Sequence, residues 1–286
     1  MTKTFHDLPL RRTRLESGLE FHYVQDGAGL PLVFVHGGAG DYTTWAPQWA
    51  AFSARYRAIS FSRRFSQPNA NPDPEPNHSA LAEAEDLKQL IDCWGARPAI
   101  LVAASYGAYV ALALATSAPN RVRTLVLIEP PLMPWAGETA EGEKLRREFE
   151  LNVEIPAREA FAAGDDDRAM TIFARGVAGP LELEKPSEAR MATRLRNLRA
   201  MKVLSASDCQ FPPLDPRAVE RIEVPVLLVS GKNTQPLLRE ICTILQRHMP
   251  RAEAVVIPGA AHAVARDQPD VFNRLVIDFL ARQGLS

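Results

Sequence analysis

The chain has 286 residues, of which 46% are hydrophobic and 23% are charged, and its formal net charge is -1. This balance is typical of a globular protein with enough apolar side chains for a sizeable core. A net charge near zero gives no electrostatic reason to expect binding to nucleic acid or to an anionic membrane. The length suits one large α/β domain, or one such domain with an inserted cap.

Residues 1–10 mix polar and charged side chains and lack an apolar run of signal-peptide length. No stretch approaches the roughly 18 uninterrupted apolar residues that a membrane span needs. Cys93, Cys209 and Cys242 are odd in number and widely spaced, which fits neither a disulfide framework nor a metal cluster. We therefore expect a cytoplasmic protein without a metal or cofactor, and a homodimer is compatible with the sequence.

Short apolar runs along the chain predict the strands of a sheet. Two partly alternating segments, 13–16 and 20–24, predict an antiparallel pair at the sheet edge, and 56–61 predicts a weaker strand. Uninterrupted apolar runs predict strands that are buried on both faces, as in a parallel sheet: 32–35, 99–102, 125–128, 226–229 and 254–257.

Helical patterns separate these runs. Apolar residues recur on one face of 84–94 and again of 272–280, and 109–115 is apolar nearly all round, which predicts a helix buried against the sheet. The alternation of strand and helix predicts an α/β fold with a mostly parallel, doubly wound sheet. In such sheets the active site lies at the carboxyl ends of the strands.

One long stretch, 132–222, interrupts the alternation. It contains no convincing buried strand, and charged or alanine-rich helical patterns such as 143–151 and 187–204 fill it. We predict a helical cap that is inserted between two strands of the core. The core would then consist of residues 1–131 and 223–286.

Ser105 is the candidate nucleophile. It follows the apolar run that ends at Ala104 and directly precedes a buried helical pattern, with small residues two positions before and after it, Ala103 and Gly107. A strand that turns sharply into a helix can hold a serine in a strained, exposed position. The first of the two small residues is usually glycine, so Ala103 is a departure. An ordinary serine at a helix N-cap is the alternative interpretation.

The glycine-rich segment 36–40 follows the first buried strand. Its flexible backbone could aim the N–H of Gly38 into the active site, where it would form an oxyanion hole with the N–H of Tyr106. A phosphate-binding loop is the alternative, but the glycine spacing does not match that of dinucleotide-binding loops. His36 itself is expected to be structural.

His262 is the candidate general base. It lies in a loop just after the last apolar run, from which a side chain can reach back over the sheet to Ser105. A nucleophile early in the chain and a histidine last is the triad order of one large class of hydrolases. A solvent-exposed loop histidine is the alternative. The remaining histidines, His6, His22, His78 and His248, are expected to be on the surface or incidental.

The chain resembles the α/β-hydrolase superfamily over nearly its whole length. The resemblance is carried by the segment 36–38, the turn at 103–107, the loop at 259–262, the strand order and the position of the cap. It implies a Ser-His-acid triad that acts through an acyl-enzyme intermediate. Haloalkane dehalogenases and epoxide hydrolases of this superfamily attack with aspartate, so the serine here separates the chain from them.

The acid departs from the usual pattern. In most of the superfamily it is an aspartate after the strand that follows the cap, but Thr234 occupies that position here. Some haloalkane dehalogenases, and lactonases similar to those that open zearalenone, carry a glutamate after the strand before the cap, where this chain has Glu129. A carboxylate there is costly to bury unpaired, and a histidine N–H would pair it. An exposed Glu129, with a water or Asn233 orienting the histidine, is the alternative.

We therefore expect a serine hydrolase that cleaves a carboxylic ester or lactone. Amidases, C–C hydrolases and perhydrolases share the same triad, and a non-catalytic small-molecule receptor on the same fold is an alternative of a different class. An apolar or aromatic substrate would suit the predicted cap, although its apolar residues could equally pack in the core. Arg63 and Arg64 follow an early strand and could approach the site, but a solvated position on the surface is expected. The apolar residues of the predicted cap that could contact such a substrate are Leu132, Met133, Trp135, Phe149, Phe161 and Phe173.

Overall fold

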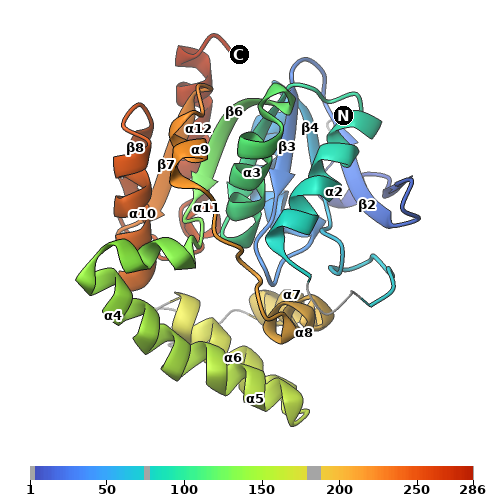
Figure 1. Ribbon diagram of the computed structural model, residues 1–286. Coiled ribbons are helices and arrows are strands. Elements are labelled where there is room, and N and C mark those ends of the chain that lie inside the picture. Colours follow the sequence, from blue (N-terminus) through green and yellow to red (C-terminus); the bar gives the residue numbers. More distant parts are fainter. Residues whose placement is uncertain (1–3, 74–77, 179–187, 286) are drawn as a thin grey trace.

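The computed structural model describes residues 4–73, 78–178 and 188–285. A single sheet of eight strands runs through the molecule (Figure 1). Its strands are β1 (Arg11–Arg14), β2 (Glu20–Asp26), β3 (Pro31–Val35), β4 (Arg57–Phe61), β5 (Ala99–Ala104), β6 (Val122–Ile128), β7 (Val226–Gly231) and β8 (Glu253–Ile257). Each of the predicted strands is present, with bounds that differ by a few residues.

The strand order is β1-β2-β4-β3-β5-β6-β7-β8. β2 pairs antiparallel with both β1 and β4, and all other neighbours are parallel. β5 and β6 therefore lie side by side, in a register that pairs Ala104 with Ile128. The residues that directly follow these two strands consequently emerge next to each other at one edge of the sheet.

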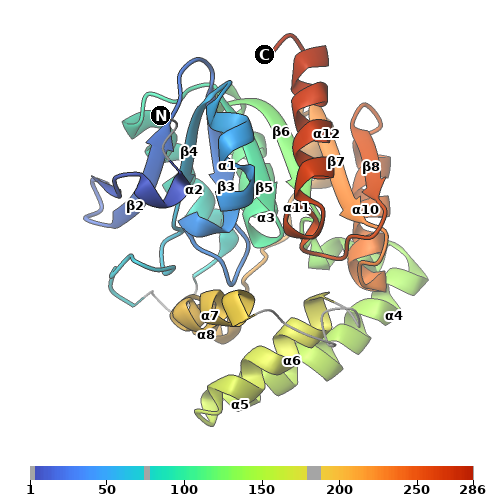
Figure 2. The same cartoon turned by 180° about the vertical axis from the view of Figure 1, so that it is seen from behind.

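Helices cover both faces of the sheet. α2 (Ala80–Cys93), α3 (Tyr106–Ser117) and α10 (Pro236–His248) pack on one face, and α1 (Ala46–Ser53) and α12 (Pro269–Arg282) on the other (Figures 1 and 2). Alternate residues of the central strands contribute to the two apolar clusters, because successive side chains of a strand point to opposite faces. The mostly parallel, doubly wound sheet is confirmed.

Between β6 and β7 the described residues form helices and loops but no strand, as predicted, and 179–187 of the predicted cap lie outside the described part. The longer helices of this insertion lie across the edge where the parallel strands end (Figure 1). They are α4 (Ala140–Phe149), α5 (Ile155–Ala162), α6 (Asp166–Ala178), α7 (Glu188–Arg196) and α8 (Leu198–Ala206), with the short α9 (Pro216–Glu220) leading back to the core. The expected division into core and cap stays a prediction.

One predicted strand differs in its burial. The run 254–257 was expected to be buried on both faces, but β8 is the last strand of the sheet and Val256 is 58% exposed. In the sequence, the apolar run of 254–257 is of the same kind as the run of a central strand. Its position at the edge depends on the order of the strands, which a local pattern does not contain.

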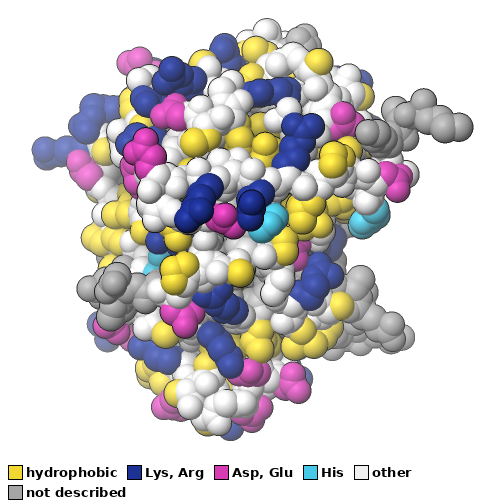
Figure 3. Space-filling model, turned by 90° about the vertical axis from the view of Figure 1, so that its right-hand side faces the viewer, with side chains coloured by type: hydrophobic (Ala, Val, Ile, Leu, Met, Phe, Trp, Pro, Cys, Tyr) yellow, Lys and Arg dark blue, Asp and Glu magenta, His cyan; other side chains and the backbone are white. Residues whose placement is uncertain are grey.

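The surface carries charges of both signs. In Figure 3 basic and acidic side chains are interspersed with apolar ones over the described part of that face, and neither sign gathers into one large patch. Within residues 4–73, 78–178 and 188–285, no helix has the length and apolar character needed to cross a bilayer.

Candidate active site

Ser105 lies between β5 and α3, with a φ of 52° and a ψ of -124°. Positive φ is costly for a residue with a side chain, and such strain persists only where the surroundings impose it. Two contacts fix the turn: the N–H of Ser105 donates to the carbonyl oxygen of Ile128 at 2.8 Å, and its own carbonyl oxygen accepts from the N–H of Ala108 at 2.8 Å. Ser105 therefore occupies a tight strand-to-helix turn rather than an ordinary N-cap.

Close packing explains why the residues around this turn are small. A Cβ placed on Gly107 would lie 2.4 Å from the carbonyl oxygen of His36, so any larger residue would push α3 away from the end of β3. A Cβ on Gly37 would lie 3.2 Å from the Cβ of Ser105. Ala103 is fully buried in β5, where its methyl group is accommodated.

Glu129 directly follows β6 and is also held at positive φ, 44°. Within the described residues, Ser105 and Glu129 are the non-glycine positions with positive φ. Glu129 is fully buried, and three donors surround its carboxylate. The N–H of Gly231 donates to Oε1 at 2.8 Å, the hydroxyl of Thr234 to Oε2 at 2.7 Å, and Nδ1 of His262 to Oε2 at 2.6 Å.

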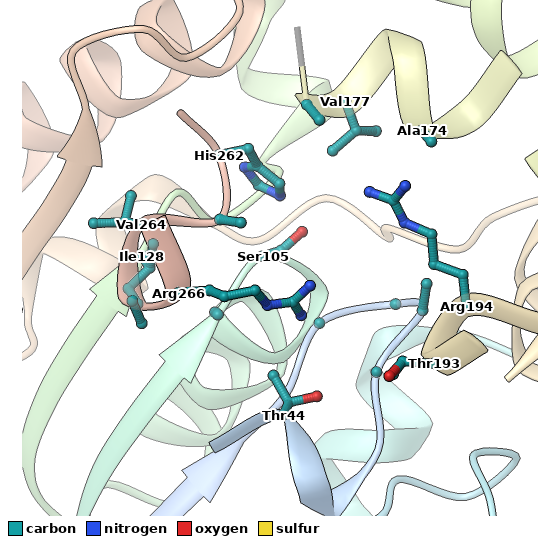
Figure 4. A pocket seen from close by; sticks show the side chains of 18 of the residues that line it. Thr44, Ser105, Ile128, Ala174, Val177, Thr193, Arg194, His262, Val264 and Arg266 are labelled. Carbon is teal, nitrogen blue, oxygen red and sulfur yellow. The ribbon is translucent and has the colours of Figure 1, made fainter. Parts of the chain in front are cut away.

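His262 lies in the loop between β8 and α11 (Val264–Asp267). The carboxylate of Glu129 can only accept a hydrogen bond, so the contact places the proton on Nδ1 and leaves Nε2 as a base. Figure 4 shows the imidazole beside the hydroxyl of Ser105, and both residues line the same pocket. Gly231 lets this loop approach, because a Cβ there would lie 2.3 Å from the carbonyl oxygen of Ala261.

The structure excludes the alternative in which Glu129 is exposed and Asn233 orients the histidine. Glu129 is buried against His262, whereas the side chain of Asn233 is exposed. Thr234 is more involved than the sequence indicated, because its hydroxyl contacts the same carboxylate oxygen as His262. This contact depends on the pairing of β6 with β7, which brings the ends of both strands together.

Both residues with predicted oxyanion donors line a pocket that Ser105 also lines. Tyr106 is the first residue of α3, so its N–H has no acceptor within the helix. Gly38 follows β3, and together with Tyr106 and Ser105 it lines one pocket. Their role in binding an oxyanion stays a prediction.

The expectation that Arg63 and Arg64 are solvated is wrong. Arg63 is 2% exposed and forms an ion pair with Glu83, with its Nη1 2.6 Å from Oε2 of Glu83. Its Nη2 donates to the carbonyl oxygen of Gly38 at 3.2 Å, and its guanidinium lies 4.3 Å from the ring centroid of Tyr106. Arg63 thus contacts both residues that carry the predicted oxyanion donors, at the carbonyl oxygen of Gly38 and the ring of Tyr106. Arg64 is half-buried in an ion pair with Asp86.

Two histidines near this ion pair are buried. Nδ1 of His36 donates to the carbonyl oxygen of Gly37 at 2.8 Å and Nε2 accepts from the N–H of Arg63 at 2.9 Å, which agrees with a structural role. His78 is expected from the sequence to be on the surface or incidental, but it is 5% exposed and its Nε2 lies 3.0 Å from Oε1 of Glu83. His36, Arg63 and Glu129 each come just after a buried strand. A charged or polar residue at such a position was the feature of the sequence that could have indicated burial near the site.

Burial and neighbouring charges shift the pKa values of this group. Burial, reinforced by the charge of Arg63, lowers the pKa of His36 to about 3, so this imidazole is neutral at physiological pH. Burial alone would raise the pKa of Glu83, but the charge of Arg63 and the hydrogen bond from His78 outweigh it and lower that pKa to about 2. Glu83 is therefore ionised.

Replacing Arg63 with lysine is expected to lower kcat about tenfold and to cost about 1–2 kcal/mol of stability. The planar guanidinium of arginine binds Glu83 and the carbonyl oxygen of Gly38 at the same time. The ammonium group of lysine lacks this planar arrangement of donors. Arg64→Lys is the matched control, since it breaks a similar pair with Asp86 that has no contact with the glycine loop. Ester turnover and urea denaturation measure both effects, and equal kcat losses in the two variants would contradict this role.

The neutral imidazole of His36 also predicts a pH dependence of stability. An unfolded histidine takes up a proton at about pH 6.5, whereas the imidazole of folded His36 takes up a proton only at about pH 3. Its contribution is complete above about pH 6.5 and is lost as the pH falls toward about 3. The free energy of unfolding, measured by urea denaturation, should fall less steeply over this range in His36→Gln than in the wild type. The same dependence of the free energy of unfolding on pH in both proteins would contradict the assignment of His36 as a buried, neutral histidine.

Ser105 and His262 lie where two lobes of a pocket meet. The first, which we call the arginine lobe, has a volume of about 160 Å³ and includes Arg194 and Arg266 in its wall. The second, the apolar lobe, has a volume of about 70 Å³ and is lined mostly by apolar side chains. An apolar cavity of about 150 Å³ accommodates a benzene ring, so the two lobes suit a small substrate.

The predicted cap residues divide between pocket and core. Met133, Phe149 and Phe173 line the apolar lobe. Leu132 and Trp135 are instead buried in the core cluster, and the indole N–H of Trp135 donates to the carbonyl oxygen of Leu214 at 3.0 Å. Phe161 is half-buried on α5 and lines neither lobe.

A strained serine at the carboxyl edge of a doubly wound sheet, beside a histidine from the last loop, defines the α/β-hydrolase class. The chain belongs to the alpha/beta hydrolase family, whose sequence profile matches residues 32–275. Among curated proteins it is similar to a candidate carbamate hydrolase, RutD, of Azorhizobium caulinodans, with 28% identity over 91% of this chain and 94% of that protein. It is also similar to the 2-(acetamidomethylene)succinate hydrolase of Mesorhizobium japonicum, with 26% identity over 90% of each.

A solved structure supports the fold. Est816, described as an N-acyl homoserine lactone degrading enzyme, superimposes with a TM-score of 0.75 over 94% of this chain and 100% of that chain, at 19% identity. At that identity the similarity concerns the fold alone. The fold and family together establish a hydrolase.

Proposed function

We propose that this enzyme hydrolyses a carboxylic ester or lactone through a triad of Ser105, His262 and Glu129. The observation that carries the proposal is the short contact of 2.6 Å between Nδ1 of His262 and the buried carboxylate of Glu129, beside a serine held at positive φ. Strain of this kind is tolerated at positions where geometry serves function. The helices of 132–222 act as a cap over the site.

In the acylation step, Nε2 of His262 takes the proton of Ser105 while Oγ bonds to the carbonyl carbon of the substrate. The N–H groups of Gly38 and Tyr106 bind the oxyanion. The C–O bond of the leaving alcohol then breaks, and the alcohol leaves with the proton from His262. Water attacks the acyl-enzyme by the same route, which releases the acid and restores Ser105. Glu129 fixes the tautomer of His262 and stabilises the imidazolium.

A carbamate or amide is a second candidate for the scissile bond. The two curated relatives are named for substrates that contain a carbamate and an acetamido group, in which the acyl carbon is bonded to nitrogen. The proposed triad is suited to both bonds, because His262 can protonate a leaving amine as it does an alcohol. Only the class of bond differs between the two candidates.

A substrate panel tests the proposal. The wild type should hydrolyse p-nitrophenyl acetate and a simple lactone, and Ser105→Ala should not. Turnover of an anilide or carbamate more efficient than that of the ester would favour the second candidate. A chain that binds esters but turns over none of them would instead be a receptor on the same fold.

A further inference from the structure

Two guanidinium groups lie in the wall of the arginine lobe of the candidate active site. Arg266 belongs to α11, four residues after His262, and Arg194 belongs to α7 in the inserted helices. Figure 4 shows both side chains pointing into the pocket from opposite sides, with their guanidinium groups toward the space beside Ser105. The hydroxyl groups of Thr44 and Thr193 line the same lobe.

The charged side chains in the described wall of the arginine lobe are basic. Its described lining residues include two arginines and no aspartate or glutamate. A guanidinium presents several N–H donors in a planar fork that matches the two oxygens of a carboxylate. An arginine that also contacts the protein therefore keeps donors for a ligand. Half-burial strengthens such a contact relative to one at an open surface.

The apolar lobe, which Ser105 also lines, has mostly apolar side chains, with the charged Glu154 and Arg158 among the others. Phe149, Phe211 and Leu238 are among its lining residues, and Gly38, Phe173 and Val177 line both lobes. A substrate whose scissile carbonyl lies at Ser105 would place one part against apolar side chains and the other between the arginines. The two lobes would therefore favour different groups at the two ends of a substrate.

We propose that the substrate is a small carboxylic acid derivative: it carries a free carboxylate, bound between Arg194 and Arg266, and an apolar portion on the other side of the scissile bond. This inference rests on the proposed function, since Ser105 defines the position of the bond. The carboxylate bridges the core and the inserted helices, because one arginine comes from each.

Matched pairs of esters test the inference in the wild type. Monomethyl adipate and methyl hexanoate differ by a carboxylate at the end of the acyl chain, and 4-acetoxybutanoate and butyl acetate differ by one on the alcohol side. At least one acidic ester should have a kcat/KM about tenfold or more above that of its neutral partner, as expected for a charge-assisted contact. Neutral esters that are hydrolysed as well as or better than both acidic ones would overturn the inference.

Variants locate the effect. Arg194→Met and Arg266→Met should each reduce the acidic-to-neutral ratio toward unity, and the ratio cancels any general loss of activity. Arg274→Met is the matched control, because Arg274 is exposed on α12 and lines neither lobe. Arg266→Lys keeps the charge and should retain part of the preference. A preference that survives both methionine substitutions would contradict the assignment of the two arginines.

Binding to an inactive variant separates this inference from the proposed function. In Ser105→Ala, adipate should bind about tenfold or more weakly after Arg266→Met is added, as measured by calorimetry. If the wild type hydrolyses no ester but this difference is found, the proposed reaction is wrong and the carboxylate site stands. If neutral esters are hydrolysed without any acidic preference and adipate does not bind, the carboxylate site is wrong and the reaction stands.

Discussion

Replacing Ser105 with alanine is expected to lower kcat for ester hydrolysis at least about 10³-fold. The variant has no atom that can form the acyl-enzyme, and the backbone donors near the site supply only a residual rate. Ser117→Ala is the matched control, since Ser117 lies exposed at the other end of α3 and should leave kcat unchanged. A Ser105→Ala enzyme that keeps more than about a tenth of the wild-type kcat would contradict the assignment of the nucleophile.

Replacing Glu129 with glutamine is expected to lower kcat about 10²-fold or more. The amide has nearly the same shape but lacks the charge that stabilises the imidazolium. The carboxylate accepts from Gly231, Thr234 and His262, so an amide NH₂ group would face at least one of these donors. It could also favour the wrong tautomer of His262. Steady-state kinetics with a check of thermal stability measure the loss.

Thr234→Ala gives a graded comparison for Glu129→Gln. From sequence alone, a change of less than about threefold in kcat is expected, because a hydroxyl cannot replace an anion. The hydrogen bond of 2.7 Å to Glu129 raises the expected loss to about three- to tenfold. A fully active Glu129→Gln enzyme, or a larger loss from Thr234→Ala than from Glu129→Gln, would mean that Glu129 is not the acid.

The sheet could be predicted because its strands carry local signals. Central parallel strands such as β5 are buried on both faces and read as uninterrupted apolar runs. Exposure at the sheet edge could not be predicted in the same way, since β8 has the same kind of run as β5. Its exposure follows from the strand order, which is a property of the whole chain.

The residues of the candidate site also divide into those whose positions could be predicted from the sequence and those whose positions could not. Ser105, Glu129 and His262 each follow a predicted strand, and the ends of parallel strands meet at one edge, so their proximity could be inferred. The pairing of Arg63 with Glu83 could not, because it depends on how α2 packs against the sheet. The shared pocket of Arg194 and Arg266 likewise required the placement of α7 over the core.

Covalent labelling tests the central claim, that Ser105 is the nucleophile, most directly. A fluorophosphonate reacts with a serine that a neighbouring base activates, and the intact mass of the protein then increases by one adduct. We expect a single adduct in the wild type, mapped by peptide mass spectrometry to Ser105, and none in Ser105→Ala. A wild type that stays unlabelled, or a label that persists in Ser105→Ala, would contradict the account.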